Sequence, residues 1–371
     1  MPRRRKKLTK SAKSAKPLTP PVQEQLLIDA VLPLIEAGGA GDRVLCSTLG
    51  RAQLAAAIIQ AHPSARVVCH FLDAYLANST REFAGGAPKF EIRCAAEFPE
   101  EQIDLAAIPT HSGGEAELTR DRLQAAHQAL VEGGRLAVST NQPKDSWLHE
   151  QMQKMFDKVT RIPTPKRGVV YIGRKTAPLK KIKSFECRFT FPDHDRIITV
   201  VSRPGVFSHR RLDQGARALL KVAEVRDGDR IIDMGCGNGA VGLALAARNA
   251  TVQVTGVDSN ARAIWCAEQG AIANELSNFA AVLTADGRWE GEGAYDLLLG
   301  NPPYYSNYRI AELFLQTAVR MLKPGGEVMI VTKNITWYKE RMAELFDDVG
   351  FAQSGHYHVV GGVNRRRRRS R

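Results

Sequence analysis

The stretch DRIIDMGCGNGAVG, residues 229–242, decides the fold of this 371-residue chain. Its apolar beginning predicts a short buried strand, and the alanine-rich residues 240–248 predict the helix that follows. Between them Gly235, Gly237 and Gly239 allow a sharp turn and let the backbone approach a ligand that a Cβ would exclude. A strand, a glycine-rich turn and a helix in this order are typical of a parallel α/β sheet that binds its ligand at the turn.

The same pattern occurs earlier in the chain, in residues 42–55 (DRVLCSTLGRAQLA). Two further segments also have a counterpart at a similar distance. The pairs are residues 42–55 with 229–242, residues 67–73 with 252–258, and residues 127–140 with 317–332, at offsets of 187, 185 and 192 residues. A nearly constant offset of this length predicts a duplicated domain. In both halves β-branched runs alternate with helix-like stretches, which predicts an α/β fold of two tandem Rossmann-like, doubly wound domains.

The repeat and the charge pattern together predict the domain boundaries. Residues 163–203 connect the two domains, and a strand over residues 184–190 begins a hairpin that leads into the second. We expect a disordered basic tail in residues 1–22, a first domain in residues 23–178, a second domain in residues 179–361 and an arginine-rich tail in residues 362–371.

The net charge of +13 is concentrated at the two ends of the chain. Residues 1–16 hold eight basic and no acidic residues, and residues 365–371 hold six more, so the remaining body is nearly neutral. A third stretch without acids covers residues 161–183. Blocks of like charge favour a polyanion as partner, and a phosphate backbone is the obvious one. A solubilising tail without a specific partner is the alternative.

Composition excludes several other classes. No apolar run approaches the roughly 20 residues of a membrane span, and the charged amino terminus has no apolar signal region, so we expect a cytoplasmic protein. The six cysteines stand far apart, and no histidines cluster with them. We therefore expect free thiols and no metal site.

The glycine-rich turn alone leaves the ligand open. Residues 237–242 (GNGAVG) also fit the dinucleotide pattern GxGxxG, and Asp258 follows about 20 residues later, as a dinucleotide site would require. This stretch is equally compatible with NAD and with S-adenosylmethionine.

A second motif, GNPPY in residues 300–304, favours methyl transfer over hydride transfer. It follows the apolar run of residues 295–299 and should lie at the carboxyl end of that strand. The nitrogen of a planar amine is a poor nucleophile until acceptors bind its two protons. The side-chain oxygen of Asn301 and the carbonyl of Pro302 are suitable acceptors, and the Tyr304 ring offers a face on which a flat substrate can stack.

These motifs resemble those of the class I S-adenosylmethionine-dependent methyltransferases with an (N/D)PP(Y/F) motif. The likeness is greatest to the bacterial ribosomal RNA guanine-N2 methyltransferases of the small subunit methyltransferase C and large subunit methyltransferase G groups. It covers residues 206–360 well, through GVFS (205–208), LDQG (212–215), the glycine loop, NPPY and the late PGGE turn.

The resemblance implies a role for each candidate site residue. The family's architecture is similar to a pair of Rossmann-like domains, and it implies that the amino-terminal copy has lost its cofactor loop. The glycines would hold the methionine part of S-adenosylmethionine, Asp233 would lie near its amino group, Asp258 would bind the ribose, Asp286 the adenine amine, and Asp213 would help to close the site. The family often has Phe-His after the two prolines, whereas this chain has Tyr304 and Tyr305. That departure leaves adenine N6 and a glutamine amide open as targets.

The first half lacks the residues that carry this chemistry. Through the repeat, Cys46 faces Asp233, Thr48 faces Gly235 and Ala52 faces Gly239, while Pro109 stands at the position of Asn301. The added side chains predict that the first copy binds no cofactor. Asp73 aligns with Asp258, and a helix cap is the favoured interpretation of Asp73.

The predicted function is methyl transfer from S-adenosylmethionine to the exocyclic N2 amine of a guanine in ribosomal RNA, without a metal. The base would leave its stack to reach Asn301, Pro302 and Tyr304, and the basic segments would hold the RNA or ribosomal subunit. We expect a monomer. The alternatives are methylation of adenine N6 in RNA or of a glutamine amide in a release factor-like protein, and a non-catalytic RNA-binding assembly factor.

Overall fold

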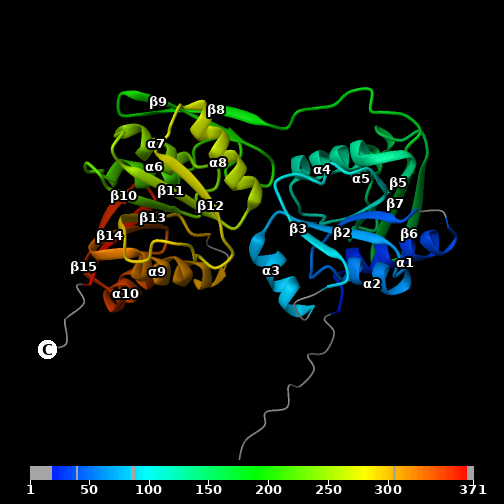
Figure 1. The fold of residues 1–371 in the computed structure, drawn as a ribbon, viewed down its shortest axis with the longest axis horizontal. Coiled ribbons are helices and arrows are strands. Elements are labelled where there is room, and N and C mark those ends of the chain that lie inside the picture. Colours follow the sequence, from blue (N-terminus) through cyan, green and yellow to red (C-terminus); the bar gives the residue numbers. More distant parts are fainter. Residues whose placement is uncertain (1–18, 39–40, 85–87, 304–305, 366–371) are drawn as a thin grey trace, which may run out of the picture.

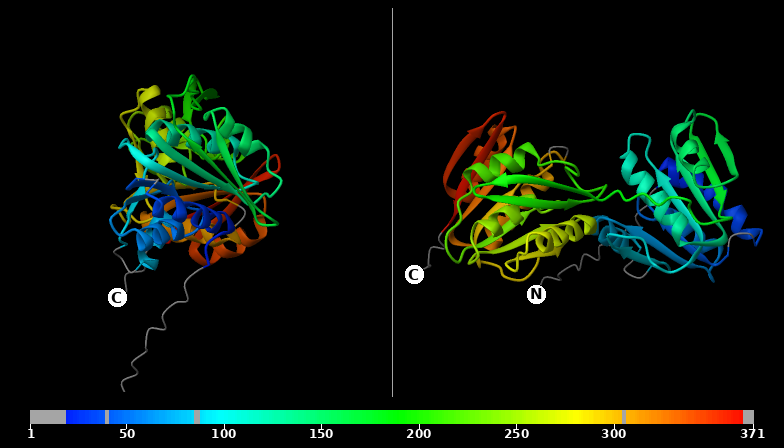
Figure 2. Two further views of the ribbon diagram at one scale, coloured as in Figure 1. Left: turned by 90° about the vertical axis from the view of Figure 1, so that its right-hand side faces the viewer. Right: turned by 90° about the horizontal axis from the view of Figure 1, so that it is seen from above.

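The computed structural model describes residues 19–38, 41–84, 88–303 and 306–365, and in this part of the chain it forms two seven-stranded sheets (Figure 1). The amino-terminal half builds one sheet and the carboxyl-terminal half builds the other. Figure 2 shows from above that a single link, between β7 and β8, joins the two bodies. Most of both predicted tails lies outside the described residues.

The first half contains strands and helices in alternation. Its elements are α1 (Val22–Glu36), β1 (Arg43–Ser47), α2 (Gln53–Ala61), β2 (Arg66–Phe71), α3 (Ala74–Phe83), β3 (Glu91–Cys94), β4 (Ile103–Thr110), α4 (Ala116–Ala129), β5 (Leu130–Thr140), α5 (Trp147–Gln153), β6 (Val159–Thr164) and β7 (Gly168–Arg174). The strand order is β3-β2-β1-β4-β5-β7-β6, in which the first five strands are parallel and β7 is antiparallel to both of its neighbours.

The second half repeats this arrangement after a short hairpin. Its elements are β8 (Cys187–Asp193), β9 (Arg196–Ser202), α6 (Gln214–Val222), β10 (Arg230–Met234), α7 (Ala240–Arg248), β11 (Gln253–Asp258), α8 (Ala261–Ala273), β12 (Phe279–Leu283), β13 (Tyr295–Gly300), α9 (Arg309–Met321), β14 (Leu322–Thr332), α10 (Ile335–Leu345), β15 (Phe346–Ser354) and β16 (Tyr357–Asn364). The strand order β12-β11-β10-β13-β14-β16-β15 matches that of the first sheet position by position. The predicted α/β fold of two tandem domains is confirmed.

The central strands of the second sheet are buried on both faces, as their continuous apolar sequence requires. In β10, Ile231 packs on the side of α6 and α7, and Ile232 packs on the side of α9 and α10. In β13, Leu299 and Leu298 divide in the same way. The sheet is therefore a rigid middle layer whose strand ends hold the following loops in place.

Three element boundaries differ from those predicted. Strand β8 begins at Cys187, three residues after the predicted start at 184, because its extent is set by pairing with β9. At the far end, β16 continues to Asn364, past the predicted start of the tail at 362, because it pairs with β14 and β15. Helix α1 begins at Val22, the last residue of the predicted amino-terminal tail.

The two halves meet through equivalent turns. Asp73 and Asn260, each the N-cap of the helix that follows the second strand, form an isolated antiparallel bridge. The Ala74 N–H donates to the Ser259 carbonyl, and the Ala261 N–H donates to the Leu72 carbonyl, both at 2.7 Å. Figure 2 shows α8 reaching the first half at this point.

This geometry corrects one predicted equivalence. The counterpart of Asp73 is Asn260, not Asp258, and Phe71 ends β2 where Asp258 ends β11. The expectation that Asp73 is a helix cap is confirmed, since its carboxylate accepts a hydrogen bond from the Leu76 N–H at 2.9 Å.

Two features are absent from residues 19–38, 41–84, 88–303 and 306–365. No helix in this part of the chain has the length and apolar character of a membrane span. Within the same residues no group of histidine, cysteine and acidic side chains is placed to hold a metal ion.

Candidate active site

The glycine-rich turn joins β10 to α7 at the carboxyl edge of the second sheet (Figure 1). Gly235, Gly237 and Gly239 all have positive φ, at 69°, 54° and 81°. A Cβ on Gly235 would lie 2.7 Å from Phe314, and one on Gly239 would lie 2.9 Å from Ala267, so these two positions are also closed by packing. Contacts within the protein therefore require glycine at these two positions, independently of any ligand.

Gly237 is different because the space above it is open. A Cβ there would meet nothing closer than the Phe207 carbonyl at 3.9 Å. Its left-handed φ still favours glycine. The turn thus presents bare backbone toward free space, which is the arrangement that the sequence predicted for a ligand site.

Asp258 ends β11 next to this turn. Its carboxylate accepts hydrogen bonds from the Gly237 N–H and the Asn260 N–H, both at 2.9 Å. Burial raises the pKa of Asp258, and the two backbone donors oppose that shift. The structure therefore brings one predicted acid into direct contact with the central glycine.

Two of the other predicted acids, Asp233 and Asp286, lie in different settings. Asp233 is 4% exposed, and its carboxylate accepts from the Gly242 N–H at 2.8 Å, which joins β10 to the first turns of α7. Burial raises the pKa of Asp233 to about 7. Asp286 lies in the exposed loop after β12, where its carboxylate contacts Thr284 and Arg288 of the same loop.

Asn301 lies beside the glycine turn because of the sheet register. Strands β10 and β13 are parallel neighbours, and Met234 pairs with Gly300, so the turn and the NPP segment leave the sheet at the same level. Asn301 is partly buried and Pro302 is buried. Tyr304 and Tyr305 lie outside the described residues, so the predicted stacking role of Tyr304 stays a prediction.

Asp213 contacts Asn301. The Asn301 Nδ2 donates to Asp213 Oδ2 at 2.9 Å. The same oxygen accepts from the Gly215 N–H at 2.7 Å and the Ala216 N–H at 3.2 Å, so Asp213 is the N-cap of α6. Sequence reasoning grouped Asp213 with the cofactor-binding residues and missed this contact, although the LDQG segment was its signal.

A loop that precedes α6 lies beside the glycine turn and contacts it at Asn238. The Asn238 side chain donates to the Ser208 carbonyl at 3.3 Å, and Phe207 is 66% exposed beside Gly237. An exposed phenylalanine next to open backbone is an apolar surface for a flat ligand. The GVFS segment was noted in the sequence, but only as part of a resemblance.

The equivalent turn of the first half is filled by the protein itself. Glu24 of α1 is fully buried, and its carboxylate accepts from the backbone N–H groups of Leu49, Gly50 and Leu54 at 2.8, 2.9 and 3.1 Å. The Thr48 hydroxyl also donates to it, at 2.5 Å. Sequence reasoning missed Glu24.

At the second motif the first half also differs. β4 continues through Thr110, so Pro109 lies inside the strand and pairs with Ser139 instead of beginning a loop. The predicted loss of the cofactor loop in this copy stays a prediction.

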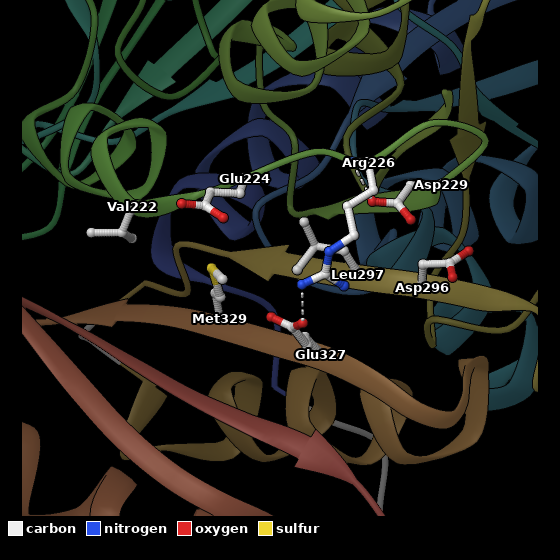
Figure 3. Close-up of a pocket in the computed structure, with 8 residues that line it drawn as sticks. All are labelled: Val222, Glu224, Arg226, Asp229, Asp296, Leu297, Glu327 and Met329. Carbon is white, nitrogen blue, oxygen red and sulfur yellow. Dashed lines mark hydrogen bonds and ion pairs between the residues drawn. The ribbon is translucent and has the colours of Figure 1, made fainter. Parts of the chain in front are cut away.

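A small cavity of about 70 Å³ lies at the opposite edge of the second sheet (Figure 3). Asp229 and Asp296 stand there at the starts of β10 and β13, and Arg226 spans the cavity to reach Glu327 at 2.9 Å. Because the glycine turn follows the other end of β10, this cavity is separate from the candidate site.

The chain was compared with known families and structures. The methyltransferase small domain family matches residues 197–361. The ribosomal RNA small subunit methyltransferase C of Pseudomonas entomophila is 34% identical over 164 residues, which are 43% of this chain and 49% of that protein. The protein of the same name from Mannheimia succiniciproducens is 31% identical over 202 residues, 53% of this chain and 60% of that one. The matches thus span about half to three fifths of these relatives.

One solved structure matches nearly the whole chain. It is a T. thermophilus 16S rRNA N2 methyltransferase in complex with AdoMet and guanosine, with a TM-score of 0.74 and 21% identity, and the match covers 92% of this chain and 91% of that one. At this level of identity the likeness shows a shared two-domain fold.

Proposed function

We propose that this chain belongs to the ribosomal RNA small subunit methyltransferase C family and transfers a methyl group from S-adenosylmethionine to the exocyclic N2 amine of a guanine in ribosomal RNA. The observation that carries the proposal is the pairing of Met234 with Gly300. It makes the loop that carries Gly237 and the loop that carries Asn301 leave neighbouring strands at the same edge of the sheet. A methyl donor and a conjugated amine need this adjacency.

The residues at the turn fit the proposed cofactor. S-adenosylmethionine supplies an electrophilic methyl group when bound. The bare backbone at Gly237 can approach its methionine part, and Asp258 offers acceptor oxygens for ribose hydroxyls. We also assign Gly235, Gly239, Asp233 and Asp286 to this site, the first three as residues that shape the turn.

Asn301 and Pro302 prepare the amine for attack. A guanine N2 lone pair is delocalised into the ring, so the nitrogen gains nucleophilicity when its protons are held by acceptors. The Asn301 side-chain oxygen and the Pro302 carbonyl are those acceptors, and proline has no N–H to compete with them. Positioning and electrostatic stabilisation, not a strong base, then supply the rate.

The proposed substrate is ribosomal RNA held by both halves. Residues 161–183 contain no acid and extend over β6, β7 and the link that follows, on the first half. Basic surface of this kind binds phosphates without regard to sequence. We also propose that the protein acts as a monomer in the cytoplasm.

The test uses the intact protein with labelled S-adenosylmethionine and three acceptors, namely purified small-subunit rRNA, assembled small subunits and a release factor. We expect label in RNA, and N2-methylguanosine when the nucleosides are separated by mass spectrometry. Methyladenosine or labelled protein would replace the proposed substrate with one of the two alternatives.

The variant Gly237→Arg serves as the control for the cofactor site. It fills the open space above the turn, so calorimetry should detect no cofactor binding while circular dichroism stays native. If the wild type itself binds no cofactor, the enzyme proposal fails and a non-catalytic RNA-binding role remains.

A further inference from the structure

We infer that Asp213 is a positioning residue that fixes which atom of the Asn301 amide faces the substrate, an inference that rests on the proposed function. Asp213 Oδ2 accepts three N–H groups, from Gly215, Ala216 and the Asn301 side chain. Two backbone N–H groups already point at this oxygen, so it acts as an acceptor. The atom that Asn301 turns toward it is accordingly the amide nitrogen.

The orientation matters because an amide has a donor on one side and an acceptor on the other. With Nδ2 held by Asp213, Oδ1 lies on the opposite side of the amide group. An unrestrained amide can rotate by 180° and present its NH2 group to the NH2 group of the target base. Two donors would then face each other, and the amine would keep its protons.

Asp213 is itself held independently of the substrate loop. It is the N-cap of α6, whose apolar side chains Leu219 and Leu220 belong to the core next to β10. The two backbone N–H groups at the start of the helix fix the carboxylate before Asn301 contacts it. Asp213 is thus held by a packed helix, whereas Asn301 belongs to the loop that follows β13.

Gly215 makes the approach of these two side chains possible. A Cβ at this position would lie 2.8 Å from Asp213 Oδ2 and 3.0 Å from both the nitrogen and the oxygen of the Asn301 amide. Gly215 has no positive φ that would by itself require glycine. Space for the Asp213–Asn301 pair is therefore the reason for a glycine in the first turn of a helix.

The first half provides an internal comparison. The helix at the same place in the fold, α1, has Pro21 as its N-cap and no side-chain cap. The position of Asn301 is occupied there by Pro109, inside a strand. The first half thus lacks both the amide at the position of Asn301 and the carboxylate at the position of Asp213, as expected if these two side chains act together.

Two substitutions at position 213 separate positioning from helix capping. Serine and asparagine are both good N-caps, so α6 should keep its start in each variant. All three hydrogen bonds go to one oxygen, and the amide oxygen of Asp213→Asn can accept the same three. The side chain of Asp213→Ser is too short to reach Asn301.

The expected readout is a split between turnover and binding. Asp213→Ser should lower kcat at least about tenfold, whereas Asp213→Asn should lower it by no more than about threefold. Cofactor affinity by calorimetry and the Tm should stay close to wild type in both. Equal losses in the two variants, or losses that follow Tm or cofactor affinity, would overturn the inference.

A double substitution tests the pair directly. Asn301→Asp sets two carboxylates face to face and should lower kcat at least about a hundredfold. Adding Asp213→Ser removes the opposing carboxylate while keeping a helix cap, and should recover at least about tenfold. No recovery in the double variant would count against a direct contact.

A measurement without turnover keeps this inference separate from the proposed function. The side-chain NH2 signals of Asn301, assigned with Asn301→Ala, should exchange slowly with water in the wild type and faster in Asp213→Ser. If the wild type methylates no RNA but this difference appears, the proposed function fails, while the inference that Asp213 orients the Asn301 amide stands. If turnover is normal and the difference is absent, only the inference about Asp213 fails.

Discussion

Among single residues, Asp233 connects burial to a measurable pH dependence. The residue is 4% exposed, and burial raises the pKa of its carboxyl group to about 7, against 3.8 for an ordinary aspartate. Between these two values the folded protein binds a proton that the unfolded chain does not. The stabilisation from that proton is therefore fully present below about pH 4 and is lost as the pH rises through 7.

We predict that Asp233→Asn removes this dependence, because the amide oxygen can still accept from the Gly242 N–H while nothing titrates. The free energy of unfolding of the wild type, minus that of the variant, should fall by about 2 kcal/mol between pH 5.5 and pH 8.5. Urea unfolding at the two pH values measures it. A difference that stays constant would show that Asp233 does not titrate in this range.

The three glycines of the turn show what residue patterns reveal and what they hide. The sequence indicated correctly that the turn between β10 and α7 needs all three, because the motif reports positive φ and close approach. It could not show that Gly235 and Gly239 are closed by Phe314 and Ala267, while Gly237 alone faces open space. Those neighbours come from other elements, and their positions depend on the tertiary fold.

At the scale of elements, local patterns predicted what local forces determine. Helix α7 spans the predicted residues 240–248, since glycine before it and an alanine-rich run set both the turn and the helix. Strands β8 and β16 end where their partners end, which no local pattern encodes. Asp73 was aligned two residues from its true counterpart because an acid near a strand end is a weak marker of register.

Glu24 is the element-scale contact that sequence reasoning could not find. It joins α1 to the turn after β1, across 24 to 30 residues, and has no motif of its own. Its carboxylate accepts from three backbone N–H groups, and its removal would leave the buried Leu54 N–H without this acceptor, whereas the Gly50 N–H would keep the Thr48 hydroxyl. A buried N–H without an acceptor costs about 1 to 3 kcal/mol.

We therefore predict that Glu24→Ala lowers the free energy of unfolding by about 1 to 3 kcal/mol. Glu36→Ala is the matched control, because Glu36 is an exposed residue of the same helix and its loss should cost less than about 0.5 kcal/mol. Urea unfolding of the wild type, Glu24→Ala and Glu36→Ala measures these differences in the free energy of unfolding. If the two variants are equally stable, the carboxylate does not hold the turn.

At the scale of the whole molecule, the first half reaches the candidate site of the second. The Gly205 N–H, next to the loop that lies beside the glycine turn, donates to Glu115 of the first half at 2.9 Å. Asn260 bridges to Asp73 and donates its own N–H to Asp258. Sequence reasoning predicted the duplication and assigned the first half to RNA binding and a structural role, but it did not predict these contacts with the second half. Contacts between domains produce no periodic pattern in the sequence of either domain, so the sequence alone does not reveal them.

A buried ion network fixes the two halves to each other. Arg262 of α8, with 4% of its side chain exposed, donates to Asp121 of α4 at 2.7 Å and to the carbonyls of Ala96 and Pro204 at 3.0 and 2.9 Å. Arg203 also contacts Asp121, at 3.2 Å. Charges removed from water in this way depend on their partners, so the loss of one leaves the others unbalanced.

We predict that Arg262→Met lowers the free energy of unfolding by about 3 to 5 kcal/mol, because Asp121 stays buried with one cation fewer. Arg188→Met is the matched control: Arg188 pairs with Glu186 on the surface, with 63% of its side chain exposed, and its loss should cost less than about 1 kcal/mol. Urea unfolding followed by tryptophan fluorescence measures the free energy of unfolding of both variants.

The number of unfolding transitions should also change. Since the ion network holds the two halves together, the wild type should unfold in one transition, whereas the two halves of Arg262→Met should unfold in two separate transitions. A single transition within 1 kcal/mol of the Arg188→Met value would show that the bridge between Asp73 and Asn260 suffices to couple the halves without the buried ions.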